Sequence, residues 1–180
     1  MGYRSLVVLP EDMSAERYER INSYGAEIIR TPGCESNVKE IYDKVNELRA
    51  DPQNLICNQF EEMGNYRFHY NVTGYAALDL AKTLASQGIG SGRVSAFVSA
   101  MGSAGTIGAA DSIKRHQGGA GVTIGVEPIQ CPTLWNCGYG GHRIEGIGDK
   151  HVTWVHHVTA VTWWTQVTCL SPIPSIRCPP

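Results

Sequence analysis

Short apolar runs alternate along the chain with stretches in which apolar residues recur every three or four positions. The short runs are typical of buried strands and lie at residues 5–9, 26–31, 54–57, 94–101 and 122–128. The helical spacing predicts helices over residues 14–25, 37–50, 75–86 and 106–116. Residues 59–74 are polar and aromatic without clear periodicity, which predicts a loop. The repeated strand–helix–strand order predicts an α/β fold with three layers, a mainly parallel sheet with helices on both faces.

Two of the predicted helices begin at residues that favour helix starts. Ser14 stands directly before the first helix, with Glu16 in its first turn. Asn37 is followed three residues later by Glu40, which resembles a capping box. We therefore expect the side chains of Ser14 and Asn37 to cap these helices.

Composition and charge describe a folded globular chain. Of the 180 residues, 42% are apolar and 18% charged, which excludes an intrinsically disordered chain and fits one domain or a small pair. The formal net charge of −2 argues against a nucleic-acid partner. No apolar run is long enough to span a membrane, and the run at 5–9 is too short for a signal-peptide core. We therefore expect a cytoplasmic protein without a membrane partner, whose six cysteines are reduced thiols.

The composition changes abruptly near residue 150. No Asp or Glu follows Lys150, whereas three of the four tryptophans, Trp154, Trp163 and Trp164, lie beyond it. Residues 151–180 are therefore interpreted as an atypical tail, either a separate segment or a sequence foreign to the rest, as a reading frame shifted near residue 157 would produce. Trp163 and Trp164 could form a surface for a partner, but we favour the interpretation that they belong to a segment that does not fold.

The strongest chemical signal is a glycine-containing loop between a predicted strand and a predicted helix. It consists of Gly102, Ser103, Ala104, Gly105 and Thr106. Glycines permit a tight turn in which successive N–H groups point into one concavity, and the helix N-terminus adds partial positive charge, so the loop can bind a phosphate. The spacing is neither that of a P-loop nor that of the dinucleotide fingerprint. A turn that merely closes a strand–helix unit is an equally good interpretation of the loop alone.

Five ordered blocks of sequence extend this signal. LPEDMSAERYERINSYGAEIIRT (9–31) is similar to M-P-x-x-M-S-x-E-R…G-A, and Gln59 opens a stretch similar to Q-F-x-N-P-x-N-x-x-x-H…T-G. SAMGSAGT (99–106) stands where A-G-V-G-T-G-G-T is expected, and GVEP (125–128) and GIG (146–148) follow in order. Through these blocks the chain resembles the fold-type II pyridoxal-phosphate enzymes of the cysteine synthase branch, which includes O-acetylserine sulfhydrylase.

The resemblance implies a domain division, a cofactor and a reaction. Residues 1–33 would be the remnant of a small domain and 36–150 most of a large domain. Residues 102–106 would cradle the phosphate of pyridoxal 5'-phosphate, Gly146 and Gly148 would line its ring, and Gln59 would lie near the substrate carboxylate. The reaction implied for a full-length relative is β-replacement or elimination on a small amino acid, the chemistry of a lyase or transferase in amino-acid metabolism.

The resemblance also identifies what this chain lacks. In the family, the lysine that binds the cofactor covalently and a Ser-Gly-Asn substrate loop both precede the strand at 5–9. The lysines of this chain match neither context; they are Lys39, Lys44, Lys82, Lys114 and Lys150. We therefore expect no catalytic residue in this chain, no covalent attachment through a family lysine, and a fragment truncated at both ends that is inactive by itself. The interrupted sheet should leave an unpaired edge and apolar surface, which predicts self-association.

Other interpretations stay open at this stage. The chain could be a non-catalytic α/β binding module, as an inactive paralogue would be, or a phosphate- or nucleotide-binding α/β domain. A metal site could be built from the histidines near the end of the chain, but neighbouring positions on a strand point to opposite faces and no acidic or thiolate ligand has suitable spacing, so we expect none. These histidines are His142, His151, His156 and His157.

Overall fold

The computed structural model describes residues 2–34, 37–138, 140–142 and 144–168. Its strands are β1 (Leu6–Asp12), β2 (Glu27–Cys34), β3 (Ala96–Ala100), β4 (Val122–Pro128) and β5 (Trp163–Val167). Its α-helices are α1 (Ala15–Ser23), α2 (Val38–Arg49), α3 (Gly64–Phe68), α4 (Gly74–Ser86), α5 (Ile107–His116) and α6 (Thr133–Asn136). A π-helical turn (His69–Thr73) joins α3 to α4, and a 3₁₀ turn (Val158–Ala160) precedes β5.

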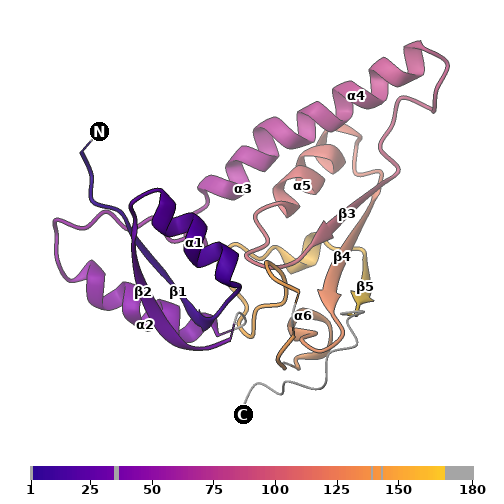
Figure 1. Ribbon diagram of the computed structural model, residues 1–180. Helices are drawn as coiled ribbons and strands as arrows, with labels where there is room; N and C mark the ends of the chain where they lie inside the picture. The colour runs from indigo at the N-terminus through magenta and orange to yellow at the C-terminus, as the bar shows by residue number, and fades with distance from the viewer. Residues whose placement is uncertain (1, 35–36, 139, 143, 169–180) are drawn as a thin grey trace.

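The described strands form two parallel sheets. β1 pairs with β2, and β3, β4 and β5 lie side by side in that order. Figure 1 places β1, α1, β2 and α2 on one side of the molecule and the three-stranded sheet with α3 to α6 on the other. Parallel neighbours require crossover connections, and α1 and α5 supply them between β1 and β2 and between β3 and β4. The predicted α/β class with parallel pairing is confirmed.

Polar side chains join the two parts of the molecule. The hydroxyl and backbone N–H of Ser14 both bond to the Glu145 carboxylate, which also forms an ion pair with Arg17 at 2.9 Å. Lys150 Nζ donates to Asn37 Oδ1 at 3.0 Å. Ser14 and Asn37 therefore stand at the N-cap positions of α1 and α2 as expected, but neither side chain caps its helix. Both are used instead for contacts with residues more than a hundred positions away.

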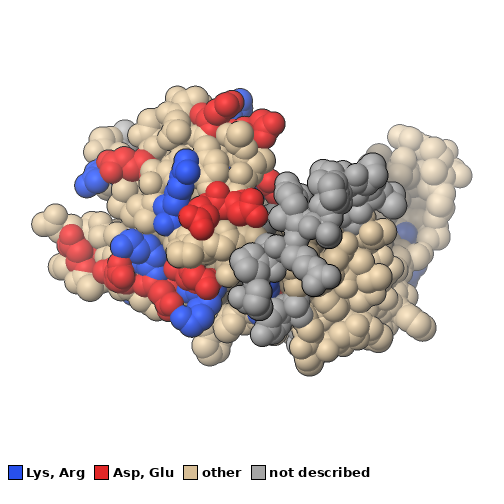
Figure 2. Space-filling model, turned by 60° about the horizontal axis from the view of Figure 1, so that its bottom comes forward, with Lys and Arg blue, Asp and Glu red and all other residues tan. Residues whose placement is uncertain are grey.

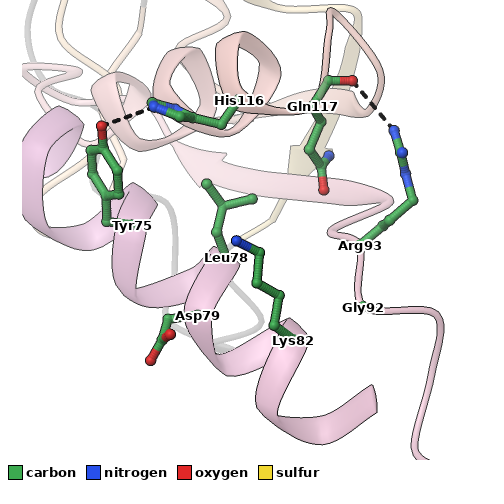
Figure 3. Close-up of a pocket in the computed structure, with 8 residues that line it drawn as sticks. All are labelled: Tyr75, Leu78, Asp79, Lys82, Gly92, Arg93, His116 and Gln117. Atoms are coloured by element: carbon green, nitrogen blue, oxygen red, sulfur yellow. Dashed lines mark hydrogen bonds between the residues drawn. The ribbon is translucent and has the colours of Figure 1, made fainter. Parts of the chain in front are cut away.

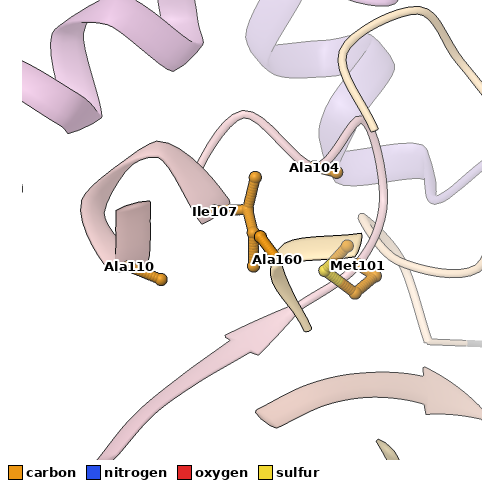
Figure 4. Packing of buried hydrophobic residues seen from close by; sticks show 5 residues of the cluster. All are labelled: Met101, Ala104, Ile107, Ala110 and Ala160. Carbon is orange, nitrogen blue, oxygen red and sulfur yellow. The ribbon is translucent and has the colours of Figure 1, made fainter. Parts of the chain in front are cut away.

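The core of the larger part lies between α5 and its sheet. Figure 4 shows five buried residues that pack together here, Met101, Ala104, Ile107, Ala110 and Ala160. Ile107 is fully buried and Met101 is 1% exposed. Met101 and Ile107 flank the glycine-containing loop, and Ala104 belongs to it. The packing of α5 onto the sheet therefore also fixes the loop.

The structure differs from the sequence-based expectations at three segments. Residues 54–57 form no strand, and Leu55 is 86% exposed. Most of the predicted loop at 59–74 is helical, because α3 and the π-helical turn cover residues 64–73. Trp163 and Trp164 do not lie in an unfolded segment but in β5, which keeps a parallel register with β4 from Ile124 onward. The prediction of a division at residues 33, 36 and 150 stays a prediction.

One face of the three-stranded sheet is apolar and is covered by no element of the described part of the chain. α5 packs against the opposite face, where Ser99, Thr123 and Gly125 are buried. In Figure 2, charged side chains gather over the part with β1, α1, β2 and α2. The uncovered face consists of Ala96, Val98, Ala100, Val122, Ile124, Val126, Trp163, Thr165 and Val167. The expected apolar surface is therefore present. Among the described residues, no helix is long and apolar enough to cross a membrane.

Candidate phosphate-binding site

The loop between β3 and α5 presents a row of backbone donors. Within the described part of the chain, no N–H group of residues 102–106 donates a hydrogen bond, whereas those of Met101 and Ile107 bond to Val126 and Ala104. Ala104 has a φ of 65°, a left-handed conformation that is unusual outside glycine and that bends the loop. The loop leads directly into the N-terminus of α5, where the helix dipole favours a negative charge. This is the geometry of an anion cradle.

The glycines of this region are required by close contacts. An added Cβ at Gly102 would lie 2.4 Å from the Gly146 carbonyl oxygen, and one at Gly105 would lie 2.4 Å from Asn65 Nδ2. At Gly108, in the first turn of α5, it would lie 2.4 Å from the Tyr66 carbonyl oxygen. At Gly102 and Gly108 the neighbour is a backbone atom, which leaves no room for a side chain, whereas at Gly105 it is the amide end of the Asn65 side chain. The loop is therefore packed from two sides, by the start of α3 and by residue 146.

Residues 146–148 lie against the loop, although at least forty positions separate them in sequence. The Gly148 N–H donates to the Met101 carbonyl at 2.9 Å. The Gly148 carbonyl in turn accepts from Cys131 Sγ at 3.1 Å and lies 3.0 Å from His142 Nε2. Gly146 and Gly148 both have positive φ, at 92° and 79°. The structure therefore brings together residues 102–106 and 146–148, which the sequence analysis assigned to one cofactor site.

His156 and Thr153 also contact the loop and were not among the predicted site residues. His156 Nε2 lies 2.7 Å from the Gly102 carbonyl, and His156 Nδ1 accepts the Thr153 N–H at 2.9 Å. These two bonds fit a neutral imidazole that carries its proton on Nε2, and burial lowers the pKa of His156 in agreement. The Thr153 hydroxyl donates to the Ser103 carbonyl at 3.4 Å. Both residues fall in the segment that composition had set apart, so sequence reasoning considered His156 only as a metal ligand.

Gln59 lies near this region without touching the loop. It is exposed in the turn at 58–62 and has no hydrogen bond to a described residue. Its neighbour Phe60 accepts hydrogen bonds at its carbonyl from the Tyr42 hydroxyl and from the Trp154 N–H. Because Trp154 follows Thr153, the segment at 153–154 connects the turn of Gln59 to the loop of Ser103.

Asp149 adds a buried acid directly after residues 146–148. Its Oδ2 is buried and has no hydrogen-bond partner among the described residues. Burial raises the pKa of Asp149 to about 6, and the nearby His142 opposes this shift. Sequence reasoning missed Asp149, because an acid that follows a glycine pair gives no signal of burial.

The lysines do not converge on the loop. Lys39 and Lys44 form ion pairs along α2, at 2.5 Å each, and Lys150 bonds to Asn37. Lys114 lies in the last turn of α5, at the end of that helix away from the loop, and donates to the Ala160 carbonyl at 2.6 Å. Lys82 lies in the second half of α4.

A pocket of about 410 Å³ lies between α4 and the C-terminal end of α5, away from the loop. Its polar groups are largely bonded to one another, as Figure 3 shows: the Tyr75 hydroxyl lies 2.8 Å from His116 Nε2, and Arg93 donates to the Gln117 carbonyl. No group of three or more metal-ligating side chains is found among the described residues.

Comparison with known proteins gives one consistent family. A family model described as pyridoxal-phosphate dependent enzyme matches residues 1–160, which extends ten residues into the predicted tail. Cysteine synthase B of Campylobacter jejuni is 32% identical over 153 residues, which are 84% of this chain and 48% of that protein. A cysteine synthase of Staphylococcus aureus is 29% identical over 147 residues, 82% of this chain and 44% of that protein.

Solved structures agree with the sequence comparisons. A hydrogen sulfide-producing enzyme from Fusobacterium nucleatum superposes with a TM-score of 0.78 at 26% identity, over 92% of this chain and 53% of that one. Cysteine synthase from Entamoeba histolytica superposes with a TM-score of 0.72 at 28% identity, over 93% of this chain and 47% of that one. The chain thus spans about half the length of the relatives that it matches.

Proposed function

The chain belongs to the family of pyridoxal-phosphate-dependent enzymes, and on that premise we propose that residues 102–106 hold the phosphate of pyridoxal 5'-phosphate. The observation that carries the proposal is the row of backbone N–H groups in this loop without a partner among the described residues. A phosphate has several acceptor oxygens and a negative charge, and both match such donors at the N-terminus of α5. The hydroxyls of Ser103 and Thr106, which form no hydrogen bond within the described part of the chain, would add two further donors.

The residues around the loop are compatible with a flat ring beside the phosphate. Gly146 and Gly148 offer backbone without side chains at the edge of the loop, and His156 hydrogen-bonds to the Gly102 carbonyl. When bound, pyridoxal phosphate supplies an electron sink for chemistry at the α-carbon of an amino acid. For the whole protein we propose a cysteine synthase-like replacement or elimination at the β-carbon of a small amino acid, with Gln59 near the substrate carboxylate.

We further propose that no lysine of this chain binds the cofactor covalently. Lys39 and Lys44 form ion pairs on α2, Lys114 lies at the far end of α5, and Lys150 contacts Asn37. Lys82 lines the pocket between α4 and the C-terminal end of α5, away from the loop. Without a lysine at the loop, the chain holds the phosphate by hydrogen bonds and charge alone, and by itself it turns over no amino acid.

Absorbance titration with pyridoxal 5'-phosphate tests the cofactor site. We expect saturable binding that inorganic phosphate weakens by competition, and much weaker binding of pyridoxal, which lacks the phosphate. Thr106→Val should weaken binding about tenfold through the loss of one charge-assisted donor, whereas Thr83→Val, at an exposed position of α4, serves as a matched control. Equal affinity for pyridoxal and its phosphate would contradict the proposal. Tighter binding of a nucleotide than of pyridoxal phosphate would favour a nucleotide-binding domain instead.

Borohydride reduction followed by mass spectrometry tests the absence of a cofactor lysine. We expect no stoichiometric label on any lysine of the chain after reduction with bound pyridoxal phosphate. Stoichiometric labelling of one lysine would refute this part of the proposal while leaving the phosphate site in place. Release of product from O-acetylserine and sulfide by the purified chain would refute the expected inactivity.

We also propose that the chain self-associates, as the uncovered apolar face of its three-stranded sheet supports. An exposed edge strand and a contiguous apolar surface both favour association. Val98, at the centre of the edge strand β3, is 60% exposed. A concentration series in sedimentation equilibrium tests this, and a monomer at all concentrations would contradict it.

A further inference from the structure

The pocket of about 410 Å³ between α4 and the C-terminal end of α5 is large enough for a small organic molecule. Sites for such molecules usually measure roughly 300–1,000 Å³. Tyr75 and Leu78 of α4 give the pocket an apolar wall, and Lys82 and Arg93 bring two cationic groups to it. It lies at the end of α5 away from the loop at 102–106, so the proposed cofactor site does not include it.

Tyr75 is held in place at this wall by the neighbouring helix. His116 Nδ1 lies 2.7 Å from the Ser112 carbonyl, so it carries a proton and donates it. In the neutral ring, Nε2 then accepts the hydrogen bond of the Tyr75 hydroxyl at 2.8 Å. The two rings also contact each other, with centroids 4.6 Å apart. Tyr75, which is 47% exposed, therefore offers a fixed aromatic surface to a molecule in the pocket.

The two cationic groups at the pocket have no acidic partner among the described residues. Lys82 forms neither a hydrogen bond nor an ion pair with any of them. The Arg93 guanidinium donates to the Gln117 carbonyl at 3.3 Å, which leaves most of its N–H donors unused. Asp79 also lines the pocket, but Figure 3 shows its carboxylate directed away from α5, whereas Lys82 and Arg93 extend toward that helix. The pocket is therefore suited to a negatively charged ligand.

The sequence around the pocket adds to this positive charge. Between residues 80 and 126 it contains one acid, Asp111, and that carboxylate is bonded to Tyr66 and His157. The same stretch contains two lysines and two arginines. The C-termini of α4 and α5 oppose an anion with about half an elementary charge each. The four full positive charges outweigh that effect.

A glycine-rich loop beside the pocket supplies backbone donors. Gly88, Gly90 and Gly92 have positive φ, at 79°, 74° and 76°, and alternate with residues of negative φ. Such alternation turns successive N–H groups toward one side, as in the backbone nests that bind anions. The N–H groups of residues 90–93 donate no hydrogen bond within the described part of the chain. Because Gly92 and Arg93 line the pocket, these donors lie beside the two cationic side chains.

We propose that this pocket binds a small organic phosphate. The phosphate would lie between Lys82, Arg93 and the N–H groups at 90–93, and the organic part would lie against Tyr75 and Leu78. An arginine presents a planar fork of donors and a lysine a compact charge, and both bind phosphate oxygens. The pocket is larger than an inorganic ion needs, and its apolar wall favours a ring or chain attached to the phosphate.

NMR titration of the isotope-labelled full chain tests the site, because amide signals locate a ligand by residue. The probes are phenyl phosphate, inorganic phosphate and succinate. We expect saturable shifts of the amide signals of residues 90–93 and 117. Phenyl phosphate should bind at least about threefold more tightly than inorganic phosphate, through its ring on Tyr75, and succinate more weakly than either.

The same titration separates this site from the cofactor loop. Signals of residues 102–106 report on that loop, so either site can fail without the other. Shifts confined to residues 102–106, or no saturable shift at residues 90–93, overturn the proposal. Succinate that binds as tightly as phenyl phosphate overturns the phosphate specificity, and equal affinity for inorganic phosphate overturns the role of the apolar wall.

Charge variants test the two cationic side chains. Lys82→Gln and Arg93→Gln should each weaken phenyl phosphate binding at least about fivefold, because each removes one charged donor. Lys39→Gln removes the same charge from the exposed face of α2 and should leave the affinity unchanged. The amide spectrum of each variant shows whether the fold is kept. Wild-type affinity in both pocket variants, or an equal loss with Lys39→Gln, overturns the proposal.

Discussion

Replacing Gly102 by alanine tests whether the loop at 102–106 is packed too closely against residue 146 to accept a side chain. The added methyl group would lie 2.4 Å from the Gly146 carbonyl oxygen, 3.2 Å from the Gly146 carbonyl carbon and 3.4 Å from Ile147 Cα. All three are backbone atoms, so no side chain can rotate aside to make room. Relief requires that the segments at 102 and 146 separate by about 1 Å, given that non-bonded carbon contacts lie near 3.5 Å.

That separation would strain the hydrogen bonds which hold the two segments together. The bond from Gly148 N–H to the Met101 carbonyl, at 2.9 Å, crosses the same contact, and His156 Nε2 approaches the Gly102 carbonyl to 2.7 Å on its other side. Overpacking costs about 1–3 kcal/mol, and a weakened hydrogen bond adds about 1 kcal/mol. We therefore expect Gly102→Ala to lower the free energy of unfolding by about 2–4 kcal/mol, and to weaken binding of pyridoxal phosphate at least tenfold.

Urea denaturation followed by circular dichroism measures the first effect, and absorbance titration measures the second. Gly64→Ala is the matched control, because an added Cβ at this first residue of α3 has no neighbour within 4 Å. Alanine there should be neutral or stabilise by up to about 1 kcal/mol through helix propensity. The reasoning is refuted if Gly102→Ala unfolds within about 0.5 kcal/mol of wild type and binds the cofactor equally well.

Three further substitutions probe buried polar groups around the loop. The pKa of Asp149 in the folded chain, about 6, lies above that of an exposed aspartate, so the free energy of unfolding should fall as pH rises from about 4 to 6. Asp149→Asn should remove this slope and stabilise the chain by about 2 kcal/mol at pH 7, which urea denaturation across pH measures. His156→Ala should lower the free energy of unfolding by about 2 kcal/mol at pH 7 and by less at pH 5, because burial lowers the pKa of His156 and the imidazole must stay neutral in the fold. An equal loss at both pH values would contradict this. Glu127→Ala should lower the free energy of unfolding by about 2–4 kcal/mol, measured with urea, because it leaves the N–H groups of Leu134 and Trp135 unpaired. An unchanged stability would contradict the role of Glu127 in holding α6.

Hydrophobic patterning predicted those helices and strands in which the apolar positions keep one spacing from the first residue to the last. β4 coincides with the predicted strand at 122–128, and α2 and α5 agree with their predictions to within one residue at each end. The continuous helical segment at 64–86, made of α3, the π-helical turn and α4, was predicted only in its second half. Its π-helical turn adds a residue to the helical repeat, which shifts the apolar positions. Its exposed side also carries Phe68, Val72 and Leu80, where a surface helix is usually polar. Periodicity alone therefore indicated a loop.

The candidate site was predictable where it depends on local geometry and not where it depends on tertiary contacts. A glycine-containing turn between a strand and a helix presents its N–H groups whatever surrounds it, so the loop at 102–106 could be proposed from sequence. The contact of His156 with Gly102 spans 54 positions, and the burial of Asp149 depends on how its segment packs. No local pattern encodes either of these, and among the residues after 140 the resemblance pointed only to Gly146 and Gly148.

β5 lies after the change of composition near residue 150 and still pairs with β4 in the three-stranded sheet. β5 pairs with β4 through backbone groups, which are the same in every sequence, so the loss of acidic residues does not prevent the pairing. The side chains also fit. Gly125 faces Trp164 in the register, and an added Cβ at Gly125 would lie 2.7 Å from a carbon of the Trp164 ring. A glycine in β4 thus provides the space into which a tryptophan of β5 packs, which is the complementarity expected of two strands that belong to one sheet.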